Sequence, residues 1–407
     1  MERSNRIISL IIAFSLFSTF SCNHDTENSR KPLLISSNGP VIPDTYTREF
    51  QSVLETARST TGTKSISATI LLGDGSELSA VANVSGDTDA VTSDMHFSVG
   101  SCTKTYITEC VFKLIEQNRL TLDDTLQVLM YDTGILNEEY KSKIDPHIRI
   151  KDLLNHRTGI DDFLGDYYYI DICFDLNSVW DPYKTLSYVT EPYYTYNYID
   201  PEENQFSYSN TDFILLGLII ENITGKKILS VINKYILNPL NMKDTYMAGV
   251  DPYWGLTSIP GPNAIGFEKV IDTWIASSEL ITEDAIAVYS STWTSGNMIS
   301  TAPELARWAK VYYQYQLRNG YIDGNVFNEG DISSSHFKER KFGYGIEYLK
   351  HESNSELWGH TGTIIGFNSL MFYMPSKDIS IAILINDHRI LRWDILDAIL
   401  DYINLTF

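Results

Sequence analysis

Apolar residues recur at helical spacing in several stretches of this 407-residue chain. Phe50, Val53, Leu54 and Ala57 would share one face of a helix over 45–57. The same 3.6-residue period predicts further helices over 101–118, 150–154, 211–223, 301–316 and 390–403. Helices are therefore expected along the whole length of the chain.

Strand-like patterns gather instead near the two ends of the expected domain. Residues 65–84 alternate between apolar and polar around Gly73–Asp74–Gly75, which is typical of a β-hairpin. Toward the C-terminus we expect three strands, over Phe342–Leu349, Asn368–Met374 and Ile379–Asn386. The turn-forming sequence Pro375–Asp378 separates the last two, so these should form a second hairpin.

The order of these elements predicts one α/β domain, of the α+β kind, over 45–407. Residues 45–118 and 300–407 would supply an antiparallel sheet flanked by helices. Residues 119–299 would form a mostly helical insertion on one side of that sheet. The polar residues over 23–44 are expected to be a tether that precedes the domain.

The first residues have the pattern of an export signal. A short basic start precedes an apolar run over 7–20, which is too short to span a bilayer but fits the core of a signal peptide. Thr19–Cys22 is similar to the cleavage box of bacterial lipoproteins, in which the cysteine becomes the lipid-modified first residue. We expect residues 1–22 to be a lipoprotein signal peptide and the protein to be periplasmic or at the cell surface, anchored to a bacterial membrane through Cys22. Without lipidation, it would be a free periplasmic or secreted protein.

Composition narrows the class of partner. The formal net charge is −21, and an acidic chain repels nucleic-acid phosphates, so we expect no nucleic-acid binding. The 8 His residues are scattered, and no His-x-His or Cys-x-x-Cys pair exists, so no metal or other cofactor is expected. The sequence gives no indication of the oligomeric state.

Three cysteines follow the expected signal peptide: Cys102, Cys110 and Cys173. Three thiols cannot all pair within one chain, and Cys102 and Cys110 lie too far apart on one helix for a disulfide. We interpret Cys102 and Cys110 as small buried apolar side chains. The alternative is a cysteine hydrolase with Cys102 as nucleophile, but no pattern of accompanying His and Asn residues supports it.

The first candidate for chemistry is Ser101–Cys102–Thr103–Lys104, at the start of an expected helix. Residues i and i+3 share a helix face, so Lys104 would point at the Ser101 hydroxyl. A serine is a weak nucleophile until a neighbour accepts its proton, and a lysine can do so when desolvation or nearby cations keep it partly neutral. The spacing alone is a weak signal, because Ser335–Lys338 repeats it in a polar stretch with no predicted helix.

Two further stretches carry candidate polar groups. Tyr208–Ser209–Asn210 opens the apolar helix over 211–223, and taken alone it would be a helix cap. A phenol can relay a proton if cations lower its pKa, and an amide can hold both a lysine and a substrate carbonyl. His360–Thr361–Gly362–Thr363 would be a strand edge whose backbone N–H completes an oxyanion hole, although a lone His near a strand is usually structural.

The order and wide separation of these three motifs favour a catalytic role over a structural one. Ser-x-x-Lys, a Tyr- or Ser-containing triplet and a Lys-Thr-Gly together are the motif set of the serine β-lactamases and penicillin-binding proteins. The chain resembles the class C β-lactamase and D-alanyl-D-alanine carboxypeptidase family of serine hydrolases over about 45–407. The resemblance includes four other stretches, Phe97–Gly100, Gln117–Asp124, Leu153–Ile160 and Gly296–Ala302. It implies a β-lactamase/penicillin-binding-protein-like transpeptidase fold.

The same resemblance implies roles for the motif residues. Ser101 would be the nucleophile, Lys104 its proton acceptor, and Tyr208 the partner acid/base that serves the leaving group. The backbone N–H groups of Ser101 and Thr363 would form the oxyanion hole. Asn210 would position the substrate.

The strand of the third motif would also bind substrate, through His360, Thr361, Gly362 and Thr363. Class C β-lactamases usually carry Lys where this chain has His360, and His-Thr-Gly is more typical of the carboxypeptidase and esterase branches. A histidine titrates near pH 6.5 when unperturbed, so its charge is conditional. We hypothesise that protonated His360 helps to bind a substrate carboxylate.

These inferences predict an exported serine hydrolase that acts through a Ser101 acyl-enzyme, most similar to a D-alanyl-D-alanine carboxypeptidase. A β-lactamase or an esterase of the same family is the alternative, and the expected substrates are accordingly a small peptide, a β-lactam or an ester. A sensor that captures penicillin or peptide without turnover is the alternative of another class. The Tyr-rich segment 167–208 would either line a substrate cleft or pack a loop-rich subdomain.

Overall fold

The computed structural model describes residues 39–174, 176, 178–190, 206–248, 263–270, 273–276, 286–318, 320, 328–329, 335–389 and 392–407. The expected signal peptide 1–22, with Cys22, and most of the tether 23–44 lie outside the described residues, as does the Tyr-rich stretch 191–205. Within the described part of the chain, we find no helix with the length and apolar character needed to cross a membrane.

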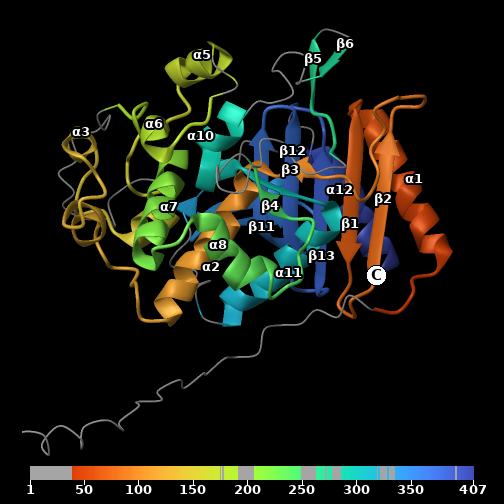
Figure 1. Ribbon diagram of the computed structural model, residues 1–407. Helices are drawn as coiled ribbons and strands as arrows, with labels where there is room; N and C mark the ends of the chain where they lie inside the picture. Colours follow the sequence, from red (N-terminus) through yellow and green to blue (C-terminus); the bar gives the residue numbers. More distant parts are fainter. Residues whose placement is uncertain are drawn as a thin grey trace, which may run out of the picture. The chain divides into compact units, whose positions relative to one another are not determined.

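An eight-stranded antiparallel sheet is the centre of the described chain (Figure 1), with the strand order β2-β1-β13-β12-β11-β10-β9-β8. Its strands are β1 (Ser65–Leu71), β2 (Glu77–Asn83), β8 (Asn328–Glu329), β9 (Phe337–Gly343), β10 (Ile346–His351), β11 (Glu356–Ile364), β12 (Phe367–Met374) and β13 (Ile379–Ile385). The N-terminal hairpin pairs with the last strand, with Ala68 opposite Ile383. The sheet is therefore built from both ends of the chain, as the sequence predicts.

Helices cover both faces of this sheet, which explains its continuous apolar strands. In β13, Ile381 and Ile383 face a core shared with α1 (Asp44–Thr61) and α12 (Arg392–Thr406), whereas Ala382 and Leu384 face the core on the other side. The edge strand β2 has one solvent-facing side and therefore alternates between buried and more exposed residues. On the second face lies α11 (Ala302–Arg318), which contacts β1, β12 and β13.

The run Phe342–Leu349, predicted as one strand, is instead divided by a hairpin turn at 344–345, so that it contains the end of β9 and the start of β10. Gly345 in this turn has φ 58°, and a Cβ there would lie 1.9 Å from Thr108 Oγ1. The apolar pattern continues across the turn because both strand ends are buried. Periodicity alone therefore did not mark the break.

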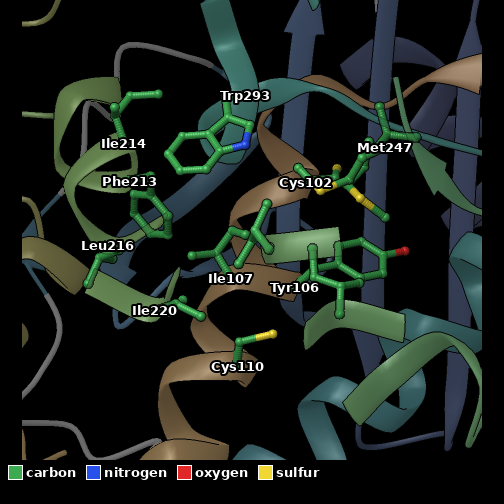
Figure 2. Close-up of a cluster of buried hydrophobic side chains, with 14 of the residues drawn as sticks. Cys102, Tyr106, Ile107, Cys110, Phe213, Ile214, Leu216, Ile220, Met247 and Trp293 are labelled. Carbon is green, nitrogen blue, oxygen red and sulfur yellow. The ribbon is translucent and has the colours of Figure 1, made fainter. Parts of the chain in front are cut away.

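Two helices that carry site residues share one buried cluster (Figure 2). Tyr106, Ile107 and Cys110 come from α2 (Thr103–Glu116), while Phe213 and Ile220 come from α7 (Asn210–Thr224). All five side chains are fully buried. This shared core fixes the start of α2 relative to the start of α7, where the first and second motifs lie.

Short elements complete the described structure. The helices are η1 (Gly100–Cys102, a 3₁₀ turn), η2 (Gln127–Tyr131), α3 (Glu138–Lys141), α4 (Ile150–Leu154), α5 (Asp166–Phe174), α6 (Pro182–Leu186), α8 (Ile228–Ile232), η3 (Asn233–Leu237) and α10 (Ile286–Gly296). Strands β3 (Phe97–Ser98), β7 (Met298–Ser300) and β4 (Tyr246–Met247) form a small sheet, and β5 (Phe267–Val270) pairs with β6 (Thr273–Ala276). Every predicted helix is present: α4 has the predicted ends, and the ends of the others are shifted by a few residues.

Candidate active site

The nucleophile candidate and its neighbour meet as the helical spacing predicts. Ser101 lies in the 3₁₀ turn η1 and Lys104 in the first turn of α2. Lys104 Nζ lies 3.1 Å from Ser101 Oγ. Ser101 is half-buried, whereas Lys104 is fully buried. The hydroxyl can therefore be approached while the amine behind it stays out of water.

The hydrogen bonds of Lys104 suit a neutral amine. Its Nζ lies 2.6 Å from Asn210 Oδ1 and 2.9 Å from the Ser295 carbonyl oxygen, and both of these atoms only accept hydrogen bonds. A neutral amine has two N–H groups for these oxygens and one lone pair left for the Ser101 hydroxyl. Burial lowers the pKa of Lys104 to about 7, against the charges of Asp162 and Asp212, which raise it. A large part of Lys104 is therefore a free base at neutral pH.

Tyr208 lies against the same amine and hydroxyl. Its ring centroid is 5.0 Å from Lys104 Nζ, and its phenol forms a hydrogen bond with Ser101. Burial raises the pKa of Tyr208 above its usual value, so the resting site does not meet the condition that cations lower this pKa. Tyr208 is therefore a neutral phenol at rest, which suits a proton donor.

His156 holds the segment that carries Tyr208. The two rings lie 4.2 Å apart between centroids, with an interplanar angle of 34°. His156 Nδ1 accepts the backbone N–H of Ser209 at 3.3 Å, and its carbonyl accepts that of Ser207 at 2.9 Å. Backbone and ring contacts therefore fix Tyr208 from both sides.

A buried carboxyl group supports His156 in turn. Asp212 Oδ2 lies 2.9 Å from His156 Nδ1, and Thr158 donates to Asp212 Oδ1 at 2.6 Å. Burial raises the pKa of Asp212 well above its usual value and lowers the pKa of His156 well below its own. Burial therefore disfavours the charged form of both groups. Sequence reasoning assigned neither residue a role, although His156 lies in the Leu153–Ile160 stretch that carries the resemblance.

Asn210, the first residue of α7, links Lys104 to a further carboxylate. Its Nδ2 donates to Asp162 Oδ2 at 2.7 Å, while the other oxygen of Asp162 accepts the backbone N–H of Leu164 at 3.2 Å. Asp162 was not predicted. It stands two residues beyond the Leu153–Ile160 stretch, and that position is the only signal that could have found it.

The third motif runs along the free part of β11. Pairing with β10 extends only to Gly359, so the next residues of this edge face the turn that carries Ser101. A Cβ on Gly362 would lie 2.0 Å from the Val99 carbonyl oxygen, and one on Gly100, where φ is 49°, would lie 2.7 Å from the Thr363 nitrogen. Only glycine permits this approach. It brings the Thr363 backbone beside Ser101, as an oxyanion hole made by both N–H groups requires.

His360 differs from its expected role as a cation. It is only 3% exposed, and its Nδ1 lies 2.6 Å from the Thr361 carbonyl oxygen, to which Nδ1–H donates. Burial lowers the pKa of His360 to about 4. The buried ring is therefore neutral at neutral pH, and the hypothesis that protonated His360 binds a substrate carboxylate applies only in acid.

Glu347 of β10 fixes the strand beside His360. Its Oε2 accepts the backbone N–H and the hydroxyl of Thr361, at 3.1 and 2.9 Å. Arg340 Nε donates to the other oxygen at 2.6 Å. The side chain and the backbone N–H of Thr361, which was predicted to bind substrate, are therefore both engaged inside the protein.

The other sequence candidates lie elsewhere or serve the core. Lys338 of the second Ser-x-x-Lys motif lies on strand β9 and donates to Asn354 Oδ1 at 3.0 Å. Ser335 and Lys338 therefore do not share one face of a helix. Cys102 and Cys110 are free and buried, and burial raises the pKa of Cys102 to about 12. This excludes Cys102 as a thiolate nucleophile at neutral pH.

The Tyr-rich segment divides between packing and surface. Tyr168 is buried, and its hydroxyl forms a hydrogen bond of 2.8 Å with Ser291 Oγ, whereas Tyr167 and Tyr169 are exposed. The tyrosines at 193, 194, 196 and 198 lie outside the described residues. In the part of the chain that the structure describes, we find no group of three or more His, Cys, Asp or Glu side chains able to hold a metal.

Comparison with protein-family models matches residues 51–397 to the model described as Beta-lactamase. Among curated proteins, the chain is 26% identical over 231 residues to the unguisins hydrolase ungD' of Aspergillus campestris. It is 24% identical over 291 residues to Protein flp of Staphylococcus aureus strain MW2. These alignments cover 54% and 71% of this chain but 38% and 52% of the relatives, so the chain spans about half their length or less.

Solved structures of three proteins show the same fold. A D-stereospecific amidohydrolase from Streptomyces has a TM-score of 0.66 and 23% identity, over 88% of this chain and 98% of its own. A D-amino acid amidase from Ochrobactrum anthropi SV3 has a TM-score of 0.69 and 20% identity, over 89% and 99%. A penicillin-binding protein from Bacillus halodurans has a TM-score of 0.62 and 17% identity, over 86% and 98%.

Proposed function

Because the chain belongs to the beta-lactamase family of serine hydrolases, we propose that it cleaves amide bonds through an acyl-enzyme on Ser101. One observation carries this proposal, namely the bonding of Lys104. Two acceptor oxygens, on Asn210 and Ser295, take the N–H groups of a buried amine whose remaining position faces Ser101 Oγ. That arrangement supplies a base next to a nucleophile.

Acylation follows from this geometry. Neutral Lys104 takes the hydroxyl proton while Ser101 Oγ attacks the substrate carbonyl. The developing oxyanion would be held by the N–H groups of Ser101 and Thr363, and one such donor contributes about 3–4 kcal/mol to lowering the barrier. The positive charge on Lys104 is then shared by the oxygens of Asn210 and Ser295.

Collapse of the tetrahedral intermediate needs a proton on the leaving amine. Tyr208 begins as a phenol beside Ser101 and can give its proton to that nitrogen, after which Lys104 returns the proton to Tyr208. A water then attacks the acyl-enzyme, and the same pair accepts its proton. Ser101 leaves as the hydroxyl, so the cycle closes without net proton change in the enzyme.

For the substrate class, we propose peptides or amides of D-amino acids. Two proteins with the same fold are described as a D-stereospecific amidohydrolase and a D-amino acid amidase. The neutral His360 favours an uncharged leaving group, because its ring offers no positive charge to a terminal carboxylate at neutral pH. D-Alanyl-D-alanine carboxypeptidase activity, which the sequence favours, is the second candidate; β-lactamase or esterase activity follows.

Four substrates measured side by side test the proposal: D-alanine amide, a peptide ending in D-alanyl-D-alanine, nitrocefin and a short p-nitrophenyl ester. We expect kcat/KM to be highest for D-alanine amide and to vanish in Ser101→Ala. A higher value for the peptide would favour the carboxypeptidase instead. Full activity in Ser101→Ala would refute the acyl-enzyme.

The non-catalytic sensor is tested by the lifetime of the acyl-enzyme. We expect a fluorescent penicillin to add to Ser101 and to leave again during turnover, as followed by intact-protein mass spectrometry. An adduct that persists for hours, without release of product, would identify a sensor.

We also propose that the protein is exported and anchored through Cys22. The support is the sequence pattern of residues 1–22. Growth of an expressing bacterium with an alkyne-labelled fatty acid should label the wild-type protein in the membrane fraction. The label should be absent from Cys22→Ala, and a label that survives this substitution would contradict the anchor site.

A further inference from the structure

We propose that Asp162 is a positioning residue that aims the lone pair of Lys104 at Ser101 and sets the pH at which this base works. The inference rests on the proposed acyl-enzyme function and goes beyond it. Asp162 touches neither Ser101 nor Lys104 through a hydrogen bond; it acts through the amide of Asn210 and through its charge.

A continuous hydrogen-bond chain carries the proposal. The backbone N–H of Leu164 holds one oxygen of Asp162 at 3.2 Å, and the other oxygen accepts Asn210 Nδ2 at 2.7 Å. Asn210 Oδ1 lies 2.6 Å from Lys104 Nζ, which in turn lies 3.1 Å from Ser101 Oγ. Every link from the backbone of residue 164 to the nucleophile is short.

The orientation of the Asn210 amide decides what Lys104 can do. A neutral amine could donate to Oδ1 or, with the amide flipped, accept from Nδ2. Only the first leaves the lone pair of Lys104 for the Ser101 hydroxyl. A carboxylate only accepts, so Asp162 requires Nδ2 on its own side and Oδ1 on the side of the lysine. Asp162 thus excludes the flip that would occupy the base.

The charge of Asp162 also acts on Lys104. Desolvation lowers the pKa of the amine, and Asp162 is the largest of the influences that raise it. The other titratable groups that face Lys104 are Asp212 and Cys102, which raise its pKa, and His156, His360 and Tyr208. Burial disfavours the charged forms of Asp212 and of both histidines. Burial also raises the pKa of Asp162, but hydrogen bonds from Leu164 and Asn210 favour its carboxylate, so Asp162 is the main source of negative charge beside Lys104.

The test measures the reactivity of Ser101 without depending on the natural substrate. A fluorophosphonate probe loses fluoride when Ser101 Oγ attacks its phosphorus, and intact-protein mass spectrometry follows the rate from pH 5 to pH 9. In the wild type, the labelling rate should fall on the acid side of this pH profile (its acid limb), where Lys104 is protonated. In Asp162→Asn we expect the acid limb to move about 1 pH unit lower, because loss of a nearby negative charge favours the neutral amine. The alkaline plateau should fall about tenfold, as one misdirected hydrogen bond implies.

Asp161→Asn is the matched control. It removes the same charge from the adjacent position, where the side chain bonds to Thr190 rather than to the site. Its acid limb and plateau should match those of the wild type. Asp162→Glu keeps the charge on a longer side chain, so its limb should stay in place while its plateau falls. It also provides a second variant if Asp162→Asn does not fold, which circular dichroism would reveal.

An acid limb in Asp162→Asn that coincides with the wild type would overturn the proposal, whatever its plateau, because a merely structural residue lowers the rate without moving the limb. A limb that moves in Asp162→Glu would overturn it as well. Failure of the acyl-enzyme proposal is distinguishable: in that case the probe would not label Ser101 in the wild type, or would label Ser101→Ala equally.

Discussion

Lys104 shows how burial converts an ordinary side chain into a base. An exposed lysine is protonated at neutral pH and could not accept the proton of a serine. Here desolvation lowers the pKa of Lys104 to about 7, while two neutral acceptors satisfy its N–H groups. The residue type is ordinary, and its setting between α2 and α7 makes it reactive.

The first prediction concerns the pH dependence that this pKa imposes. Only neutral Lys104 accepts the proton, so kcat/KM of the wild type should fall about tenfold per pH unit below pH 7. Lys104→Met should lower kcat/KM by about 10²–10⁴-fold at pH 8. Lys113→Met, on the same helix but paired with Glu109 and Glu116, is the control and should keep wild-type activity. A wild-type rate that stays flat from pH 5 to pH 8 would contradict the assignment.

The second prediction concerns His360. Its pKa of about 4 keeps the ring neutral between pH 5 and pH 9, so no part of the pH profile in that range should report its charge. In His360→Gln, which is neutral at every pH, the acid limb of kcat/KM should stay where it is in the wild type. If the limb moves, the charge of His360 takes part in the reaction after all.

At the scale of elements, the site depends on three segments held at close range. The turn η1 presents Ser101, β11 passes beside it, and the start of α7 supplies Asn210. Trp293, inside α10, has φ 32°, a conformation that costs a non-glycine residue about 1–3 kcal/mol. The kink directs the Ser295 carbonyl, two residues on, toward Lys104.

The third prediction tests the approach of η1 to β11. In Gly100→Ala the new Cβ would meet the Thr363 nitrogen at 2.7 Å, so the strand must move and the oxyanion hole must widen. We expect kcat to fall about 10²–10³-fold. Gly62→Ala is a matched control, since Gly62 has φ 66° with open space around its Cβ. Gly62→Ala should lower the free energy of unfolding by about 1 kcal/mol and keep wild-type activity. Equal kcat values in the two variants would argue against the close approach.

For the described molecule as a whole, one sheet separates two hydrophobic cores. The core between the sheet and α1 and α12 contains Leu396, whereas the core that α2 and α7 share contains Leu216. Both leucines are fully buried. The first core stabilises the sheet on the side of α1 and α12, while the second also sets the distance between the first two motifs.

The fourth prediction compares the two cores. Leu396→Ala and Leu216→Ala should each lower the free energy of unfolding by about 2–5 kcal/mol, as measured by denaturant titration. Only Leu216→Ala should also lower kcat/KM of the folded enzyme, because α7 carries Asn210 and Asp212. A comparable loss of kcat/KM in Leu396→Ala would contradict the separation of the cores.

The sequence by itself determined the six helices that it predicted, most strands of the large sheet and the family, because these follow from local periodicity and from motifs whose order survives in one dimension. It also determined the Ser101–Lys104 contact, since three residues on a helix fix that geometry. The break between β9 and β10 was missed, because both sides of the turn are apolar.

Only the tertiary structure decided the protonation states and the supporting residues. The neutral His360, the lowered pKa of Lys104 and the raised pKa of Tyr208 all result from burial, which depends on elements far away in the chain. Asp162 and His156 reach the site only after α7 packs against α2, and their residue types alone did not indicate a role. Periodicity encodes which face of an element is buried, but not which distant side chain it will meet there.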